Sequence, residues 1–226
     1  MMEGDKITIY MQCLNWTCGE EAYFDIMLTK DAAVHVSWGD NHCVTVRKNF
    51  EEWQRVEHLY PKNSKLSHDK FVIYIESEAP GQIIGFRNWS IDMHTESIDL
   101  SGCPDLQYFT AEFMSKLDLT HSSKLKELYI RGCTMSEIDL SANTELEKIE
   151  CPCSELRKLN LGKCRNLKEV ICWCCFNLTH IGISNDSTLK CIRMDKDTPI
   201  KESSMRFLRE AIERNDGEII YNDNDF

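Results

Sequence analysis

A repeat of about 21 residues dominates the sequence from residue 97 onward. One segment, here called the first-phase segment, has the form Ile-Asp-Leu-Ser or a close variant and begins at Ile98, Leu117, Ile138, Leu159 and Ile181. The second-phase segment has the form Leu-x-x-Leu-x-Leu, with Ile, Val, Cys or Met as variants, and begins at Leu125, Leu146, Leu167 and Leu189. Successive copies are 19 to 22 residues apart. Because a unit this short cannot bury an apolar face alone, the repeat predicts a solenoid of stacked coils.

Each repeat contains two short apolar segments and leaves no room between them for a helix of useful length. The Leu-x-Leu alternation is the period of a β-strand, whose inward residues are two apart. Each coil is therefore expected to contain two short strands joined by turns, and the expected fold class is mainly β.

The repeat consensus, L-x-x-L-x-C-x-x-(N/C)-x-L-x-x-L-D-L-S-x-(N/C), resembles a leucine-rich repeat. It is most similar to the short repeats with a cysteine ladder of internalin J-type bacterial surface proteins. Four to five repeats match, over roughly residues 97–197. The resemblance implies parallel strands on a concave face, and that such a face binds another protein.

The region before the repeats has a different pattern, in which short alternating or apolar runs are separated by turn residues. These runs are Ile7–Tyr10, Tyr23–Leu28, Val34–Trp38, Val44–Val46 and Phe71–Ile75. Several short strands with intervening turns predict an antiparallel β-sandwich. The insertion Asn49–Glu57 is expected to form a short helix.

Two motifs in this region resemble those of a PKD-like, immunoglobulin-type domain. They are Trp38-Gly39-Asp40 and His58-Leu59-Tyr60, followed by the strand at Phe71. Asn41 stands where that family has a second glycine, and no glycine follows Tyr60 before the next strand. The resemblance implies a spacer or a cap without chemistry of its own.

The C-terminal residues have a helical pattern. Met205, Leu208 and Ile212 lie at helical spacing in 203–215, and Ser203 or Ser204 is expected to cap the helix start. Gly217 should end this helix, and 218–221 could add a last strand. Solenoid ends expose apolar edges, so the helix is expected to act as a cap.

The expected architecture is an N-terminal β-sandwich, a short leucine-rich repeat β-solenoid and a C-terminal helical cap. The expected domains are a PKD-like sandwich at 5–90, a solenoid of about five 21-residue repeats at 91–200, and a capping helix and strand at 201–226.

Charge and hydropathy narrow the classes of partner. The chain has 26 Lys and Arg against 37 Asp and Glu, a net charge of -11, which argues against nucleic acid because that binding rests on neutralising phosphates. No apolar run approaches the roughly 20 residues needed to cross a bilayer, so membrane insertion is not expected. Residues 1–6 contain no apolar signal region, which favours a cytoplasmic protein. A trimmed leader would instead make it secreted or cell-surface.

Most of the 12 cysteines fall at fixed positions of the repeat. Counted from the first Leu of a second-phase segment, position 6 holds Cys151 and Cys172, where a thiol is expected to point inward as a small hydrophobe. Position 9, where the family has Asn, holds Cys133 and Cys175, and Cys103 and Cys164 occupy the matching first-phase position. Free, mostly buried thiols are the expectation, and no cofactor is expected.

Adjacent coils also carry a group of five thiols that could bind a metal: Cys151, Cys153, Cys172, Cys174 and Cys175. Zinc takes four sulfurs in a tetrahedron, but the C-x-C spacing differs from the C-x2-C of zinc knuckles. Disulfides across stacked strands have poor bridging geometry. A thiol-based metal or redox module is therefore the alternative hypothesis for the function.

No motif of a known catalytic class is present: there is no G-x-S-x-G, no phosphate loop, no H-E-x-x-H and no G-x-G-x-x-G. The histidines are expected to be solvated or to lie in turns: His35, His42, His58, His68, His94, His121 and His180. The sequence therefore predicts a protein that is not an enzyme.

The outward positions of the second-phase strands supply the candidate binding residues. If these strands form the concave sheet, one face carries Tyr108, Tyr129, Arg131, Ile171, Trp173 and Arg193. Aromatic and Arg residues are enriched at binding hot spots, so recognition of a protein partner is the expected function. If the first-phase strands line the concave face, Asp99, Asp118, Asp139 and Asn160 would favour a basic ligand. Carbohydrate binding or cell-surface adhesion is a third possibility.

Overall fold

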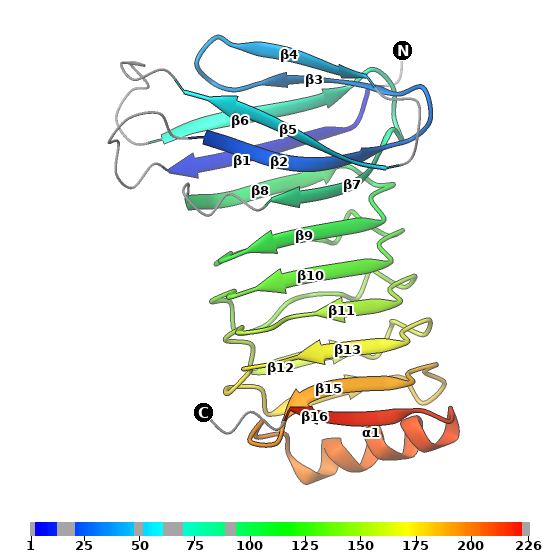
Figure 1. Cartoon of the computed structure of the whole chain (residues 1–226). Helices are drawn as coiled ribbons and strands as arrows, with labels where there is room; N and C mark the ends of the chain where they lie inside the picture. The colour runs from blue at the N-terminus through cyan, green and yellow to red at the C-terminus, as the bar shows by residue number, and fades with distance from the viewer. Residues whose placement is uncertain (1–2, 13–20, 48–51, 61–69, 89–93, 223–226) are drawn as a thin grey trace. The chain divides into compact units, whose positions relative to one another are not determined.

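The computed structural model describes residues 3–12, 21–47, 52–60, 70–88 and 94–222 (Figure 1). Strands make up 46% of the structure and helix 7%, so the expectation of a mainly β fold is confirmed. The chain consists of two compact units, Met1–Thr110 and Ala111–Phe226, and each is described by itself.

The first unit is built from antiparallel strands. They are β1 (Lys6–Gln12), β2 (Glu21–Leu28), β3 (Ala33–Ser37), β4 (Cys43–Arg47), β5 (Trp53–Leu59), β6 (Lys70–Ser77), β7 (Ile83–Asn88) and β8 (His94–Gly102). One sheet has the order β4-β3-β6-β1-β8, and β5, β2 and β7 are neighbours in another. The five strands expected from the alternating runs are confirmed as β1, β2, β3, β4 and β6.

The short helix expected at Asn49–Glu57 is wrong over its described part, since Trp53–Leu59 is strand β5. β5 pairs antiparallel with β2 and places Val56 opposite Phe24. Only Val56 is buried within β5, whereas backbone pairing with β2 extends along the whole strand. Its side-chain alternation is too weak to reveal the strand before the partner is known. Residues 48–51 lie outside the described residues.

Aromatic side chains fill the interior of the first unit. The ring of Phe24 lies 5.5 Å from that of Trp38 and 5.3 Å from that of Phe86. Tyr60 donates a hydrogen bond from its hydroxyl to the Trp38 carbonyl at 2.8 Å. Aromatic pairs of this kind contribute about 0.5–1.5 kcal/mol beyond the area that they bury.

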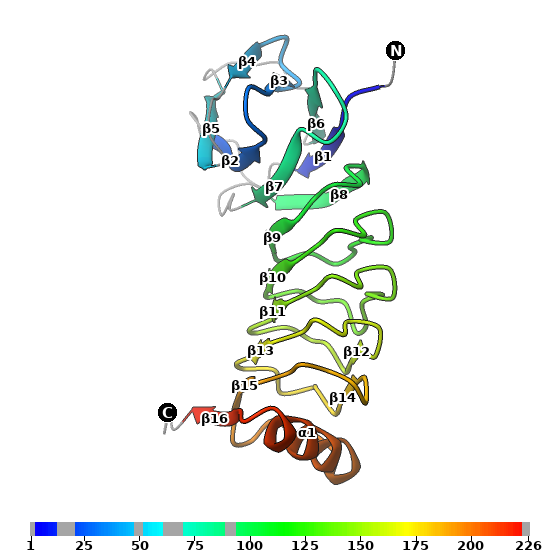
Figure 2. The same ribbon diagram turned by 90° about the vertical axis from the view of Figure 1, so that its right-hand side faces the viewer.

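Two sets of parallel strands run along the coils of the second unit (Figure 2). One sheet contains β10 (Glu127–Arg131), β11 (Lys148–Glu150), β13 (Glu169–Cys172), β15 (Cys191–Asp195) and β16 (Glu218–Asn222). β12 (Lys158–Leu161) pairs with β14 (His180–Ile183) in the other. β9 (Tyr108–Glu112) crosses the boundary between the units. The predicted solenoid is confirmed as a β-solenoid of about five turns.

The repeat register sets the core of the second unit. The first Leu of each second-phase segment is fully buried, at Leu125, Leu146, Leu167 and Leu189. Fully burying a Leu side chain stabilises the fold by about 1.5–3 kcal/mol. The first-phase segments behave differently, because 117–119 and 138–140 have no strand pairing although Leu119 and Leu140 are buried.

The C-terminal helix α1 (Glu202–Arg214) packs against β14 and confirms the helix expected at 203–215. The expected serine cap is wrong, since Lys201 is at the N-cap position and makes no side-chain cap hydrogen bond. Ser204 is buried instead. Its hydroxyl donates to the carbonyl of Ile181 at 2.6 Å and accepts the amide of Ile181 at 3.1 Å.

Gly217 ends the helix and starts the last strand. Its amide donates to the carbonyl of Ile212 at 2.9 Å, and a Cβ atom at this position would lie 2.0 Å from the carbonyl oxygen of Lys190. Only glycine therefore allows the backbones to approach so closely. The expected last strand is confirmed as β16, parallel to β15.

Candidate functional site

The outward face of the second-phase sheet is the candidate binding surface. Backbone pairing places Tyr129 opposite Glu150, Glu150 opposite Ile171, and Ile171 opposite Arg193. The expected outward row is therefore continuous, and Ile220 of β16 extends it. Parallel neighbouring strands lie about 4.8 Å apart, so each row presents a regular column of side chains.

Charged side chains surround the middle of this row. The Nζ atom of Lys148 lies 2.7 Å from a carboxylate oxygen of Glu150 and 3.3 Å from one of Glu169. Arg193 donates from Nε to Glu169 at 2.9 Å. Burial raises the pKa of Glu169, but these hydrogen bonds and charges outweigh it and hold that pKa below its usual value.

Ile171 contributes little surface to this face. Only 8% of the residue is exposed, and its strand neighbours in the row are Glu150 and Arg193. The expectation that Ile171 presents an accessible apolar contact is therefore not met. Its neighbours in the row have long charged side chains, whose methylene groups can cover apolar surface.

The accessible aromatic and Arg residues lie in or directly after the strands of this sheet. Tyr129 and Trp173 are half-buried, and Arg131 is exposed with its guanidinium 3.7 Å from Glu112. Partial burial, followed by the charge of Glu112, raises the pKa of Tyr129. Tyr129, Arg131, Trp173 and the half-buried Arg193 are therefore the members of the candidate set that a partner could contact directly.

Phe113 joins this group, although sequence reasoning missed it. Its side chain is 52% exposed, and its amide donates to the carbonyl of Arg131 at 2.8 Å. It occupies position 8 of its coil, the same position as Gly132 in the next coil. A large aromatic residue aligned with a glycine was the signal that could have identified it.

Tyr108 belongs to the first unit and is engaged there. Its ring packs edge-on against Trp53 with centroids 6.4 Å apart. The guanidinium of Arg87 lies over the Trp53 ring, 3.7 Å from the ring centroid. Tyr108 is therefore described with the first unit and not with the other five candidate residues.

The alternative site consists of the aspartates of the first-phase segments. Their carboxylates accept hydrogen bonds from nearby residues of the same turn. Asp118 and Asp139 each accept the amide two residues later at 2.9 Å, as does Asp99 in the first unit. Side-chain hydrogen bonds from Thr120 and Ser141 lower the pKa of Asp118 and Asp139. A depression of about 330 Å³ lies nearby, lined by residues of both charges: Glu137, Ile138, Asp139, Leu140, Ser141, Asn160 and Lys163.

The five thiols of the metal hypothesis do not converge. Cys151, Cys172 and Cys175 are fully buried, whereas Cys153 is exposed and Cys174 is half-buried. Within the described ranges, no group of three or more His, Cys, Asp or Glu residues is placed to hold a metal ion. Burial is the first cause that raises the pKa of Cys172 well above that of a free thiol.

Residues at position 9 and at the matching first-phase position bond the preceding coil. Asn143 donates from Nδ2 to the carbonyls of Leu119 at 3.0 Å and Ser122 at 2.8 Å. The thiol of Cys175 donates to the carbonyl of Cys151 at 3.0 Å. A buried thiol thus replaces the Asn side chain as a donor to the preceding coil. Cys13 and Cys18 lie outside the described residues.

His58 contradicts the expectation of a solvated histidine. Its Nε2 atom lies 2.7 Å from Oδ2 of Asp40, and both side chains are at most one-tenth exposed. The imidazole stacks on Trp38 at 5.2 Å and on His42 at 4.8 Å. The pair therefore joins the two short motifs at Trp38 and His58 inside the first unit.

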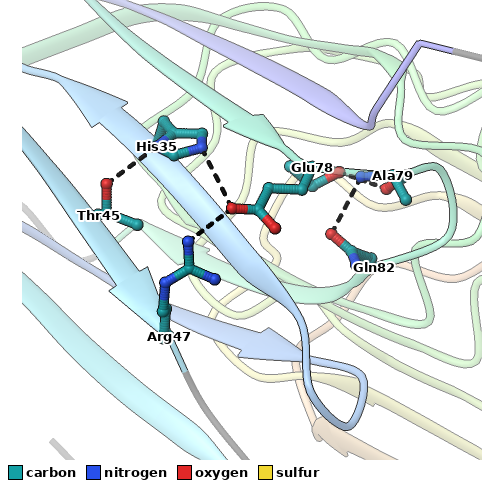
Figure 3. A network of polar contacts seen from close by, with 7 residues as sticks. His35, Thr45, Arg47, Glu78, Ala79 and Gln82 are labelled. Atoms are coloured by element: carbon teal, nitrogen blue, oxygen red, sulfur yellow. Dashed lines mark hydrogen bonds and ion pairs between the residues drawn. The ribbon is translucent and has the colours of Figure 1, made fainter. Parts of the chain in front are cut away.

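His35 is a solvated histidine, as expected. Its Nδ1 lies 2.9 Å from the hydroxyl of Thr45, and its Nε2 lies 3.6 Å from Glu78, which also pairs with Arg47 at 2.8 Å (Figure 3). All of these side chains are at least 40% exposed or lie on the exposed face of β3 and β4. Such surface pairs contribute about 0–1 kcal/mol each. His68 lies outside the described residues.

Comparison with known proteins adds no assignment. No family model matches the sequence, and no curated protein is significantly similar to it. Among the described residues, no helix combines the length and the apolar character required to cross a bilayer.

Proposed function

We propose that this chain is a non-catalytic recognition module of the leucine-rich repeat type, and that it binds a protein partner through the outward face of its second-phase sheet. The observation that carries the proposal is that Phe113, Tyr129, Arg131 and Trp173 are accessible and lie in or directly after regularly stacked strands. Aromatic and Arg side chains dominate the energetics of protein interfaces. A regular sheet also presents them with little conformational entropy to lose on binding.

The repeat sequence supports the proposed family. The internalin J-type consensus repeats in register with the observed coils, and its Asn position is filled by Asn143, Cys164 and Cys175. In this proposal α1 and β16 act as the cap of the solenoid. The buried side of α1, formed by Met205, Leu208, Ala211 and Ile212, supports that role.

The first unit is proposed to be a PKD-like sandwich that serves as a spacer. The contacts of Asp40 with His58 and of Tyr60 with Trp38 support the resemblance, because they connect the two motifs from which it was inferred. Both contacts are structural hydrogen bonds inside a core of aromatic rings.

The test is affinity purification from extracts of the native host, with the full chain as bait. A specific partner protein should be retained by the wild type and lost with Tyr129→Ala/Trp173→Ala, while the melting temperature stays unchanged. Phe176→Ala is the matched control, because Phe176 is an exposed aromatic outside this group. Equal retention by the double variant would reject the proposed face. Loss with Asp118→Ala/Asp139→Ala instead would move the site to the first phase.

The competing hypothesis of a thiol-based metal or redox module has a separate readout. Metal analysis of the purified protein, together with a count of free thiols, distinguishes it from a recognition module. One tightly held zinc per chain would favour the competing hypothesis. Carbohydrate binding or adhesion would appear as retention on a glycan array by the wild type.

A further inference from the structure

Position 8 of the second-phase repeat is a left-handed corner in four successive coils. The φ angles are +56° at Phe113, +62° at Gly132, +55° at Cys153 and +56° at Cys174. Glycine adopts this conformation without strain, whereas residues with a Cβ atom are disfavoured there. The chain thus places two cysteines at a backbone position that favours glycine. Strain of this kind is often retained where a side chain has a function.

The two corner cysteines lie next to each other on adjacent coils. The Cys153 amide donates to the Trp173 carbonyl at 2.7 Å, which continues the in-register pairing of β11 with β13. The Cys153 thiol is close enough to that of Cys174 to help raise its pKa. Adjacent strands are about 4.8 Å apart, and disulfides join Cα atoms about 4.4–6.8 Å apart. The spacing of adjacent coils therefore lies within the range that a disulfide spans, at a corner that follows the ends of β11 and β13.

No other pair of described cysteines combines contact with exposure. The remaining repeat thiols at positions 6 and 9 are fully buried. Cys191 is half-buried, but its strand neighbours are Glu169 and Glu218. Cys43 is exposed on β4, where its partner in the register is Ser37. Among the described cysteines, a reagent in solution would thus meet two neighbouring thiols that are not fully buried only at the corner.

We propose that Cys153 and Cys174 form a dithiol site that reacts with a low-molecular-weight disulfide and closes into a disulfide between adjacent coils. The more exposed Cys153 attacks first as its thiolate, forms a mixed disulfide with half of the reagent, and releases the other half as a thiolate. The Cys174 thiolate then attacks the Cys153 sulfur, forms the protein disulfide and releases the second half. Both released thiolates take up the protons lost by the two cysteines, so one disulfide is reduced for each one formed.

The surroundings of Cys174 determine how fast the second step runs. Its amide donates to the carboxylate of Asp195. Burial, followed by the neighbouring Cys153 and Asp195, raises the pKa of the Cys174 thiol. Because the thiolate is the attacking species, closure should accelerate as the pH rises from neutral to alkaline. The reaction does not depend on whether the sheet face binds a partner.

The test uses the full-length reduced protein and oxidised glutathione as the probe. After incubation, free thiols are alkylated under native conditions, and the disulfide-linked peptides are mapped by mass spectrometry. The expected product is a peptide pair joined through Cys153 and Cys174, with the loss of two hydrogen atoms. Cys174→Ser should instead accumulate a glutathione adduct on Cys153.

Cys191→Ser is the matched control, because it removes a half-buried thiol that has no cysteine neighbour, and it should leave the cross-link unchanged. Circular dichroism melting of each variant checks that the fold is retained. Stable glutathione adducts on both cysteines of the wild type without a cross-link would overturn the proposal. Alkylation of both thiols in the presence of excess oxidised glutathione would also overturn it.

Discussion

The ring of Phe113 lies over Gly132, where an added Cβ atom would come within 2.7 Å of two ring carbons. Gly132 also has a φ of +62°, which a residue with a Cβ atom adopts at a cost of about 1–2 kcal/mol. The glycine therefore allows both the left-handed corner and the placement of the exposed aromatic ring.

Gly132→Ala should consequently lower the free energy of unfolding by about 1–2 kcal/mol from backbone strain, with a further loss from the clash. Urea unfolding measures the change. Adding Phe113→Ala should remove the clash with the ring but leave the backbone strain. The double variant should therefore be more stable than Gly132→Ala. Equal stability of the two variants would contradict the contact between the ring and the glycine.

The buried pair of Asp40 and His58 should make stability depend on acidity. Burial raises the pKa of Asp40, but the hydrogen bond from His58 and the amide of His42 outweigh it and leave the pKa below the ordinary value of 3.8. A carboxyl with a depressed folded pKa contributes stability that is present above the unfolded pKa and is lost as the pH falls through the folded pKa.

Asp40→Asn should therefore flatten the fall in unfolding free energy below about pH 4. Denaturant unfolding between about pH 2 and pH 6 measures the slope. Asp31→Asn is the matched control, since Asp31 is an exposed aspartate in the turn between β2 and β3 of the same unit and its replacement should keep the wild-type slope. A steep acid transition that persists in Asp40→Asn would exclude this carboxyl as its source.

Asn143 should tolerate cysteine better than alanine. Asn143→Ala removes two donors from the buried carbonyls of Leu119 and Ser122, and leaving such groups unpaired costs about 1–3 kcal/mol. Asn143→Cys should lose less, because Cys103 and Cys164 occupy the same first-phase position in other repeats. Thermal unfolding ranks the variants against the exposed control Asn166→Ala. A cysteine variant as unstable as the alanine variant would show that a thiol does not replace the amide.

The charges around Ile171 should order the sheet face more than they stabilise it. Glu169→Gln weakens ion pairs to Lys148 and Arg193 whose side chains are 34% and 40% exposed. Pairs this exposed contribute at most about 1 kcal/mol, so urea unfolding should show a loss below that value. Glu147→Gln, which weakens the exposed pair with Lys168, is the control and should behave similarly. A loss of several kcal/mol from Glu169→Gln alone would show that the network is structural.

The repeat made the second unit predictable, because the same inward position is buried in successive coils. An inward position occupied by Leu in one coil and by Cys or Ile in another is identified by its period, so the columns through Leu146 and Cys151 followed from spacing alone. The first unit has no such internal check. Strand β5 and the burial of His58 depend on partners distant in the chain, and no local pattern reveals them.

The site was predictable to the same extent. The rows containing Tyr129 and Arg193 followed from the register, whereas the covering of Ile171 depends on which way long charged side chains turn. Only Gly132 indicated the left-handed corner in the sequence. The other corner residues have a Cβ atom and give no such signal: Phe113, Cys153 and Cys174.

The uniform register of β11, β13 and β15 also means that the fold does not require a particular number of coils. A coil bonds only its two neighbours, so duplication or deletion of one whole period would join surfaces that already match. Recombination between repeats could thus lengthen or shorten the presented surface in steps of one strand, leaving the aromatic core of the first unit and the packing of α1 on β14 unaltered. Growth by whole modules gives such a chain a route to new specificities that does not require a new core.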